Sequence, residues 1–161
     1  MDTPRYEFDS LANFIGKTSL DTIYAKYYGI ISVGQVGLTR SNEKSKLKVG
    51  LWTEYYHSGQ IKSQGEYRIA IYTNCCSNGP CWNYYGYKTG KWTYYYENGQ
   101  IESTGTYIVN VEKMNTSCKG GDRAPHHRIS KEWTFFNEDG SKKKLDKSLK
   151  KKLEELDWSG W

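Results

Sequence analysis

Two stretches of the chain carry the same pattern of apolar and polar positions. The first, GLWTEYYHSGQIKSQGEY, spans residues 50–67, and the second, GKWTYYYENGQIESTGTY, spans residues 90–107, at an offset of 40 residues. Apolar and polar residues alternate with a period of two, which is typical of strands with one buried face. The fixed offset predicts a fold built from repeated units.

Two weaker copies flank this pair. EWTFFNEDGS at residues 132–141 follows at an offset of 41, and YYGIISVG at residues 27–34 is a degenerate copy with a shorter turn. The third copy has Lys142 and Lys144 where the first has Ile61 and Ser63, so the repeat is expected to end there. We therefore place the repeats at 48–142, between an N-terminal region (1–47) and a C-terminal region (143–161).

Each clear copy is predicted to be a β-hairpin. Ser58-Gly59, Asn98-Gly99 and Asp139-Gly140 suit a two-residue turn in which both central residues have positive φ. That register pairs Trp52 with Gly65, so each indole is expected to lie over the bare backbone of a strand glycine. The positions with this structural role are Trp52, Gly59, Gly65, Trp92, Gly99, Gly105, Trp133 and Gly140.

The recurring Trp, Tyr-Tyr, two glycines and terminal Tyr resemble the MORN-repeat variant found in YwqK-type antitoxin-like proteins. The resemblance covers about residues 48–142. It implies a mainly β fold, with antiparallel hairpins forming one elongated, twisted sheet, and a binding role without catalysis. The copies lie farther apart here than in the family, and the additions at 68–89 and 108–130 are expected to form either extra hairpins or a lid.

The two ends of the chain favour helices. Leu145, Leu149, Leu153 and Leu156 recur at helical spacing, and lysines lie between them. We expect a basic amphipathic helix that either caps the last hairpin or serves as a binding arm, with Trp158 and Trp161 beyond it. Tyr6, Phe8, Leu11, Phe14 and Ile15 favour a short N-terminal helix packed on the other end of the sheet.

Composition agrees with a single β domain over residues 1–161. Aromatic residues make up 16% of the 161 residues, and the net charge is only +5. The chain holds no apolar run long enough to span a membrane, and its start lacks the basic-then-apolar order of a secretory signal. Both observations predict a cytoplasmic protein.

Strand alternation places a row of rings on the face opposite the tryptophans. Tyr55, Tyr95 and Phe136 occupy equivalent positions, and we expect Lys62 and Lys143 beside them. A second cluster of aromatics, Tyr84, Tyr85 and Tyr87, is expected at the surface as well. The row is either a binding surface for a protein, since tyrosine is enriched at interfaces, or core beneath a second layer.

Four cysteines, Cys75, Cys76, Cys81 and Cys118, fall in the additions between the repeats. In a cytosolic protein, reduced thiols are the first expectation, and a disulfide is the expectation for an exported one. An irregular zinc set of Cys76, Cys81, Cys118 and His126 is a third alternative.

Three functions fit these features. The first is a non-catalytic inhibitor, of the antitoxin, immunity or anti-defence type, that occludes a toxin or defence enzyme such as a nuclease. Alternatively, the chain binds RNA by stacking bases on tyrosines and holding phosphates with Lys142, Lys143, Lys144, Lys150, Lys151 and Lys152. A membrane-associated scaffold, lying on lipid through the basic helix, ranks last. No motif of a catalytic site or cofactor site occurs, so neither activity nor cofactor is expected.

Overall fold

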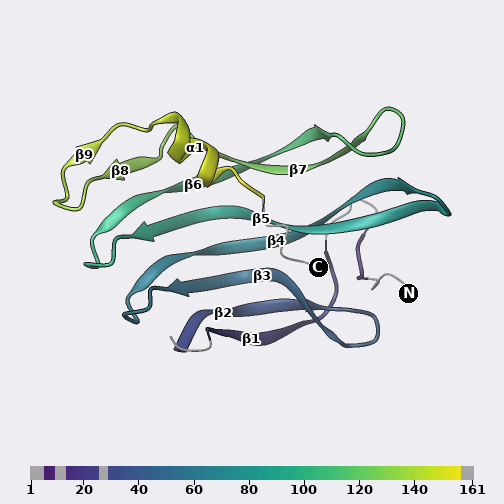
Figure 1. Cartoon of the computed structure of the whole chain (residues 1–161), viewed down its shortest axis with the longest axis horizontal. Helices are drawn as coiled ribbons and strands as arrows, with labels where there is room; N and C mark the ends of the chain where they lie inside the picture. The colour runs from purple at the N-terminus through teal and green to yellow at the C-terminus, as the bar shows by residue number, and fades with distance from the viewer. Residues whose placement is uncertain (1–5, 10–13, 26–28, 157–161) are drawn as a thin grey trace.

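The computed structural model describes residues 6–9, 14–25 and 29–156. It is an open antiparallel sheet of nine strands with one short helix over it (Figure 1). The elements are β1 (Thr18–Ala25), β2 (Gly29–Leu38), β3 (Lys44–Tyr55), β4 (Ile61–Cys76), β5 (Gly79–Tyr95), β6 (Ile101–Met114), β7 (Asp122–Ile129), β8 (Thr134–Phe136), β9 (Lys142–Lys143) and α1 (Lys147–Leu153).

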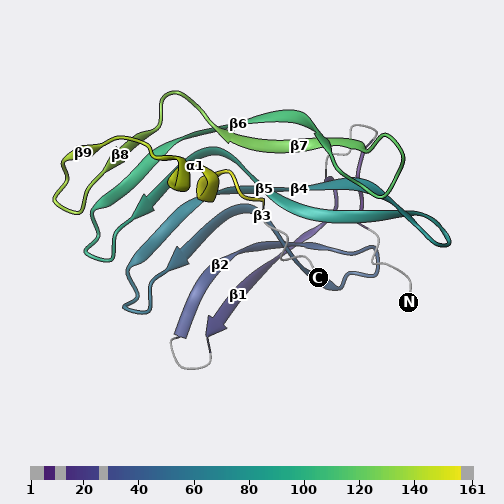
Figure 2. The same ribbon diagram turned by 45° about the horizontal axis from the view of Figure 1, so that its top comes forward.

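Neighbouring strands follow the chain in the order β1-β2-β3-β4-β5-β6-β8-β9, and β7 pairs with the second half of β6. Figure 2 shows how the sheet curves from β1 to β9. The mainly β fold and the C-terminal helix are confirmed, and the helix is shorter than the predicted segment.

The repeats are hairpins, but their turns have three residues instead of two. Tyr56 N donates to Gln60 O (2.8 Å), Gly59 N donates to Tyr56 O (2.9 Å), and Gly59 has φ +84°. Gly99 and Gly140 close identical turns, with φ of +84° and +82°. Only the glycine needs the left-handed conformation in this geometry, so Ser58, Asn98 and Asp139 are not forced into it.

The predicted register holds beyond the turn because a bulge compensates for the extra loop residue. Glu54 pairs with Ser63 and Trp52 with Gly65, as expected, whereas Tyr55 pairs with Ile61 and leaves Lys62 as the additional residue on β4. β6 repeats this bulge at Glu102.

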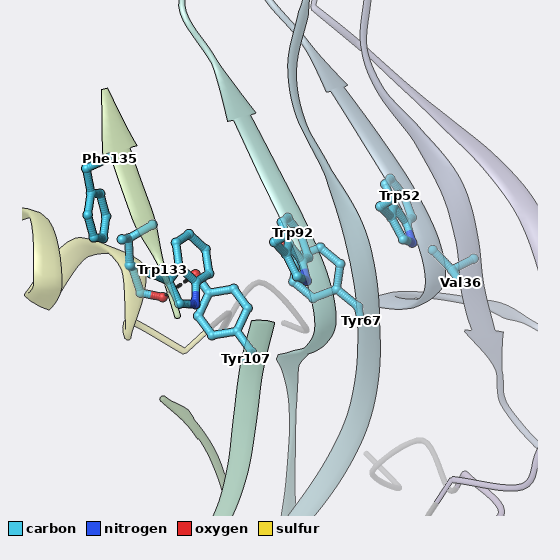
Figure 3. Close-up of a cluster of buried hydrophobic side chains, with 8 residues drawn as sticks. Val36, Trp52, Tyr67, Trp92, Tyr107, Trp133 and Phe135 are labelled. Carbon is cyan, nitrogen blue, oxygen red and sulfur yellow. Dashed lines mark hydrogen bonds between the residues drawn. The ribbon is translucent and has the colours of Figure 1, made fainter. Parts of the chain in front are cut away.

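Each indole packs on a glycine of the preceding hairpin, not on its own cross-strand partner. A Cβ built on Gly65 would fall within the indole of Trp92, and Gly34 and Gly105 stand in the same relation to Trp52 and Trp133. The indole N–H then donates to the next carbonyl, from Trp52 to Gln35 O (2.7 Å), from Trp92 to Glu66 O (3.2 Å) and from Trp133 to Thr106 O (2.9 Å). The expected contact within a hairpin is therefore wrong, and the tryptophans join one hairpin to the next (Figure 3).

The degenerate copy forms the first hairpin. Gly29 has φ +73°, and Gly34 receives the indole of Trp52 as Gly65 receives that of Trp92. Ser32, Ser63 and Ser103 are equally buried in the three hairpins. Tyr27 and Tyr28 lie outside the described residues.

The additions between the repeats lengthen the strands and also cover one another. Residues 66–89 extend β4 and β5 into a long ribbon, and residues 107–129 form the β6–β7 ribbon. Tyr85 Oη donates to Pro125 O (2.6 Å), and Thr73 N donates to the Asp122 carboxylate (2.7 Å). The two ribbons share a small core of Ala70, Tyr85, Tyr87, Met114 and Ala124.

The described part of the N-terminal region is extended, so the predicted helix is wrong there. Phe8 and Phe14 form an antiparallel bridge, closed by Ile15 N donating to Glu7 O (3.0 Å). Tyr6, Phe8 and Phe14 do pack on the sheet, against Tyr84 and its neighbours. Ile15 is exposed, and Leu11 lies outside the described residues.

The C-terminal helix caps the tryptophan side of the sheet, as one of the two interpretations expected. Asp146 caps α1 by accepting from Leu149 N (2.8 Å). Leu149 and Leu153 pack against the tryptophan cluster, and Tyr107 Oη donates to Leu153 O (2.8 Å). Trp158 and Trp161 lie outside the described residues.

Candidate functional site

The face opposite the tryptophans carries a row of partly exposed apolar side chains. Tyr55, Tyr95 and Phe136 end β3, β5 and β8 at equivalent positions. Ile61 and Ile101 pair with the two tyrosines and are 39% and 40% exposed. Cross-strand partners share a face, so the isoleucines fill the spaces of about 10 Å between equivalent positions two strands apart. We call Tyr55, Ile61, Tyr95, Ile101 and Phe136 the outer row.

Sequence reasoning missed both isoleucines. The predicted two-residue turn paired Ile61 with Tyr56 and so placed it on the tryptophan side. The bulge at Lys62 moves Ile61 to the partner position of Tyr55. The sequence signal for them is the recurrence of Ile directly after the turn Gly-Gln in both clear copies.

Polar neighbours of the outer row are mostly neutral. Gln64 Nε2 donates to Thr53 Oγ1 (3.0 Å), and the hydroxyls of Thr93 and Thr104 share a hydrogen bond (3.1 Å). These four side chains are uncharged and hydrogen-bond to each other within the sheet. The surface next to the row, which we call the neutral belt, therefore carries little charge.

Two partly buried hydrogen bonds hold the row in position. Tyr56 Oη donates to Tyr95 O (2.6 Å), and Tyr96 Oη donates to Phe136 O (2.8 Å). Both bonds join one hairpin to the next and end on a main-chain carbonyl of an outer-row residue. The strand ends that carry the rings are therefore fixed relative to each other.

Neither Lys62 nor Lys143 lies on the face of the outer row, which corrects the expected placement, although Lys62 lines a cavity together with Tyr55 at the edge of the row. The bulge turns Lys62 toward the tryptophan side, where it lines a cavity with Glu54 and Ser63 and lies over the ring of Tyr56. Lys143 Nζ donates to Tyr96 Oη (2.8 Å) and lies 5.4 Å from the centre of that ring. Both lysines pack on tyrosines that support the row.

Tyr84, Tyr85 and Tyr87 are core residues, so their expected exposure is wrong. They are 6%, 0% and 4% exposed. Tyr84 contacts the N-terminal segment, whereas Tyr85 and Tyr87 lie between the two ribbons. The sequence could not show this, because the covering segments come from distant parts of the chain.

The tryptophan side holds a polar cluster that sequence reasoning did not find. Lys48 Nζ contacts Glu54 Oε1 (2.8 Å), and Ser63 Oγ donates to Glu54 Oε2 (3.0 Å). Burial would raise the pKa of Glu54, but the Lys48 ammonium and these hydrogen bonds hold it below its usual value. Lys48 also lies over Trp52 and Tyr67, and Lys88 lies over Trp92, Tyr94 and Tyr107.

The six lysines considered for nucleic acid do not share one surface role. Lys143 is bonded to Tyr96, and Lys152 lines the cavity beside Glu54. The exposed lysines of α1 stand near Glu154, whose carboxylate contacts Arg128 (3.2 Å), and Glu155. Binding of nucleic acid through Lys142, Lys144, Lys150 and Lys151 stays a prediction.

The four cysteines form two disulfides, Cys75–Cys118 and Cys76–Cys81, which corrects the expectation of reduced thiols. The zinc alternative needed three of these sulfurs as thiolates, and His126 Nδ1 contacts Ala124 O instead (3.1 Å). Within residues 6–9, 14–25 and 29–156, no cluster of three metal-ligating side chains occurs. A cytoplasmic location stays a prediction, and the disulfides weigh against it because they are rare in a reducing compartment.

In the part of the chain that the structure describes, no helix has the length and apolar character needed to cross a bilayer.

Comparison with known proteins supports the repeat. The family model described as the MORN repeat variant matches residues 48–68 and 88–108, from Lys48 and Lys88 through each Trp, turn and terminal Tyr. Neither curated proteins nor solved structures give a significant match to the chain. This repeat is generally a protein-interaction module. Two segments of the chain, in the β3–β4 and β5–β6 hairpins, are thus similar to the MORN repeat variant, within a sheet to which two further hairpins contribute.

Proposed function

We propose that this chain is a non-catalytic protein-binding module that engages its partner through the outer row. In the finer form of the proposal, it is an inhibitor of the antitoxin, immunity or anti-defence type, and it occludes an enzyme such as a nuclease.

The observation that carries the proposal is the rigid, partly exposed outer row itself. Tyrosine and phenylalanine offer large contact areas at small entropic cost, and binding energy concentrates on such anchors. The row stands on strand ends joined by Tyr56 and Tyr96. Preorganised anchors of this kind lower the ordering cost of association.

The test is to capture the partner from the native host, identify it by mass spectrometry, and measure its Kd for purified variants by calorimetry. Tyr95→Ala with Phe136→Ala removes two rings but keeps the carbonyls that accept from Tyr56 and Tyr96. We expect the double variant to lose about 2 kcal/mol of binding free energy or more. Thr93→Ala, on the neutral belt beside the row, is the matched control and is expected to bind as wild type does.

Unchanged affinity in the double variant contradicts the outer row as the interface. An affinity for RNA that collapses as salt rises, with no protein captured, indicates the nucleic-acid alternative instead.

A further inference from the structure

Two cavities on the tryptophan side lie next to each other. The larger, about 480 Å³, lies near β1 to β3, and the smaller, about 180 Å³, reaches α1. They share Glu54, Tyr56 and Lys62 as lining residues, so they are neighbours. We call the pair the lysine groove.

The groove is polar in the middle and apolar at its ends. Ile23 and Ile31 line the larger cavity, and Leu149 and Leu153 of α1 line the smaller one. Between them stand four lysines, Lys48, Lys62, Lys88 and Lys152.

Positive charge exceeds negative charge along this lining. Two carboxylates, Glu54 and Glu102, belong to it. Glu54 is already in contact with Lys48 and Ser63, and Glu102 lies 4.0 Å from Lys143, which is outside the lining. Lys62 and Lys152, whose chains enter from β4 and α1, therefore face a site with room for further negative charge.

We propose that the lysine groove binds an acidic peptide segment of a partner protein, with its carboxylates beside Lys62 and Lys152 and its apolar side chains at the isoleucine and leucine ends. Charge-assisted hydrogen bonds from lysine to carboxylate supply the recognition. This site lies on the face of the hairpins opposite most of the outer row, and it meets the row at Tyr55, which lines the larger cavity.

The two glutamates favour a peptide over a nucleic acid. A polyanion would bring one phosphate per nucleotide against Glu54 and Glu102, whereas a peptide brings a carboxylate only where a lysine faces it. A sugar-phosphate chain has no apolar groups to bury at the two ends of the groove, whereas leucine-like side chains would bury apolar surface there.

The experiment is a fluorescence-polarisation titration of the full chain with a short labelled peptide that has adjacent glutamates between leucines. The matched probe has glutamines in place of the glutamates, and a third probe is single-stranded oligouridylate. Lys62→Gln with Lys152→Gln is the test variant. Lys91→Gln with Lys119→Gln removes the same charge at exposed positions outside the groove and is the control.

We expect wild type and the control to bind the glutamate peptide, and the test variant to bind it about tenfold more weakly. Equal binding of both peptides, or an equal loss in the control, overturns the proposal, as does tighter binding of the oligonucleotide or no binding at all. Tyr95→Ala, which alters the outer row but not the groove, is expected to keep wild-type peptide affinity, so failure of the outer row and failure of the groove are distinguishable.

Discussion

The turn end and the ribbon end of the same sheet are held together in different ways. At the turn end the same contacts recur from hairpin to hairpin, with an indole on a glycine of the preceding hairpin and a tyrosine hydroxyl on a carbonyl of the next one. At the ribbon end the contacts occur once, through the Cys75–Cys118 disulfide, the Asp122 carboxylate and the His127 ring. A repeat array adds similar interfaces along the chain, whereas the ribbons depend on individual residues.

Trp92→Ala tests the recurring contact and is expected to have the largest effect. Losing a buried indole costs about 3–5 kcal/mol, measured as the free energy of unfolding in urea. Gly65→Ala, which drives a Cβ into that indole, is expected to destabilise by about 1–3 kcal/mol alone. In the double variant the indole is gone and the clash is absent, so the destabilisation should be smaller than the sum of the two single effects. If the two effects simply add, the indole and the glycine are not in contact.

Cys75→Ser with Cys118→Ser tests the ribbon end. This disulfide joins residues 43 apart, and its removal is expected to cost about 2–4 kcal/mol. Amide exchange should rise first in β7 and the tip of β4–β5, while the turn end stays protected. Cys76→Ser with Cys81→Ser, which opens a bridge between residues only 5 apart, is the control with the smaller expected effect. Equal loss of protection at both ends would contradict the division into two regions.

His127 gives the ribbon end a pH dependence that begins at higher pH than that of the turn end, where the Glu54 carboxyl has a lowered pKa. Its Nδ1 accepts from Lys88 N (3.2 Å), so Nε2 carries the proton and donates to Leu153 O (3.2 Å). Burial, together with the nearby Lys88 ammonium, lowers the pKa of His127 from 6.5 to about 4. As pH falls, His127 is protonated in the unfolded chain before it is protonated in the folded protein. The free energy of unfolding is therefore highest above pH 6.5 and decreases as pH falls toward 4, by up to about 3 kcal/mol.

Urea unfolding between pH 7 and pH 5.5 measures the first part of this loss, in a range in which ordinary carboxylates stay almost fully ionised. His127→Phe is expected to flatten the slope in that window, and an unchanged slope would exclude His127 as its source.

Tyr96→Phe tests the smallest effect, the loss of the hydroxyl that joins the β5–β6 hairpin to the β8–β9 hairpin. Removing its bond to Phe136 O is expected to cost about 1 kcal/mol. Tyr56→Phe removes the equivalent bond in the preceding pair, whereas Tyr96→Phe also removes the bond from Lys143 Nζ, so the loss for Tyr56→Phe should be equal or smaller. A clearly larger loss for Tyr56→Phe would mean that the hairpins are not equivalent units.

Much of the turn end was predictable because its determinants are close in sequence. The pairing of Trp52 with Gly65 follows from one hairpin, and it holds in the structure. The predicted placement of Lys62 was wrong because of one local error. The turn has three residues, and its bulge moves the Lys62 side chain to the other face of the sheet. The sequence therefore predicted the three aromatic rings of the candidate site, but it did not predict the isoleucines or the placement of the lysines.

What the sequence by itself determined is the set of hairpins, their register beyond the turn bulges and the presence of a C-terminal helix, since these depend on alternation, turn glycines and apolar spacing over a few residues. Only the tertiary structure decided which hairpin each indole packs on, which cysteines pair, and that Tyr85 is buried. Those outcomes depend on how segments some 40 residues apart come to lie side by side, and strand curvature and packing, which no local pattern encodes, set that arrangement.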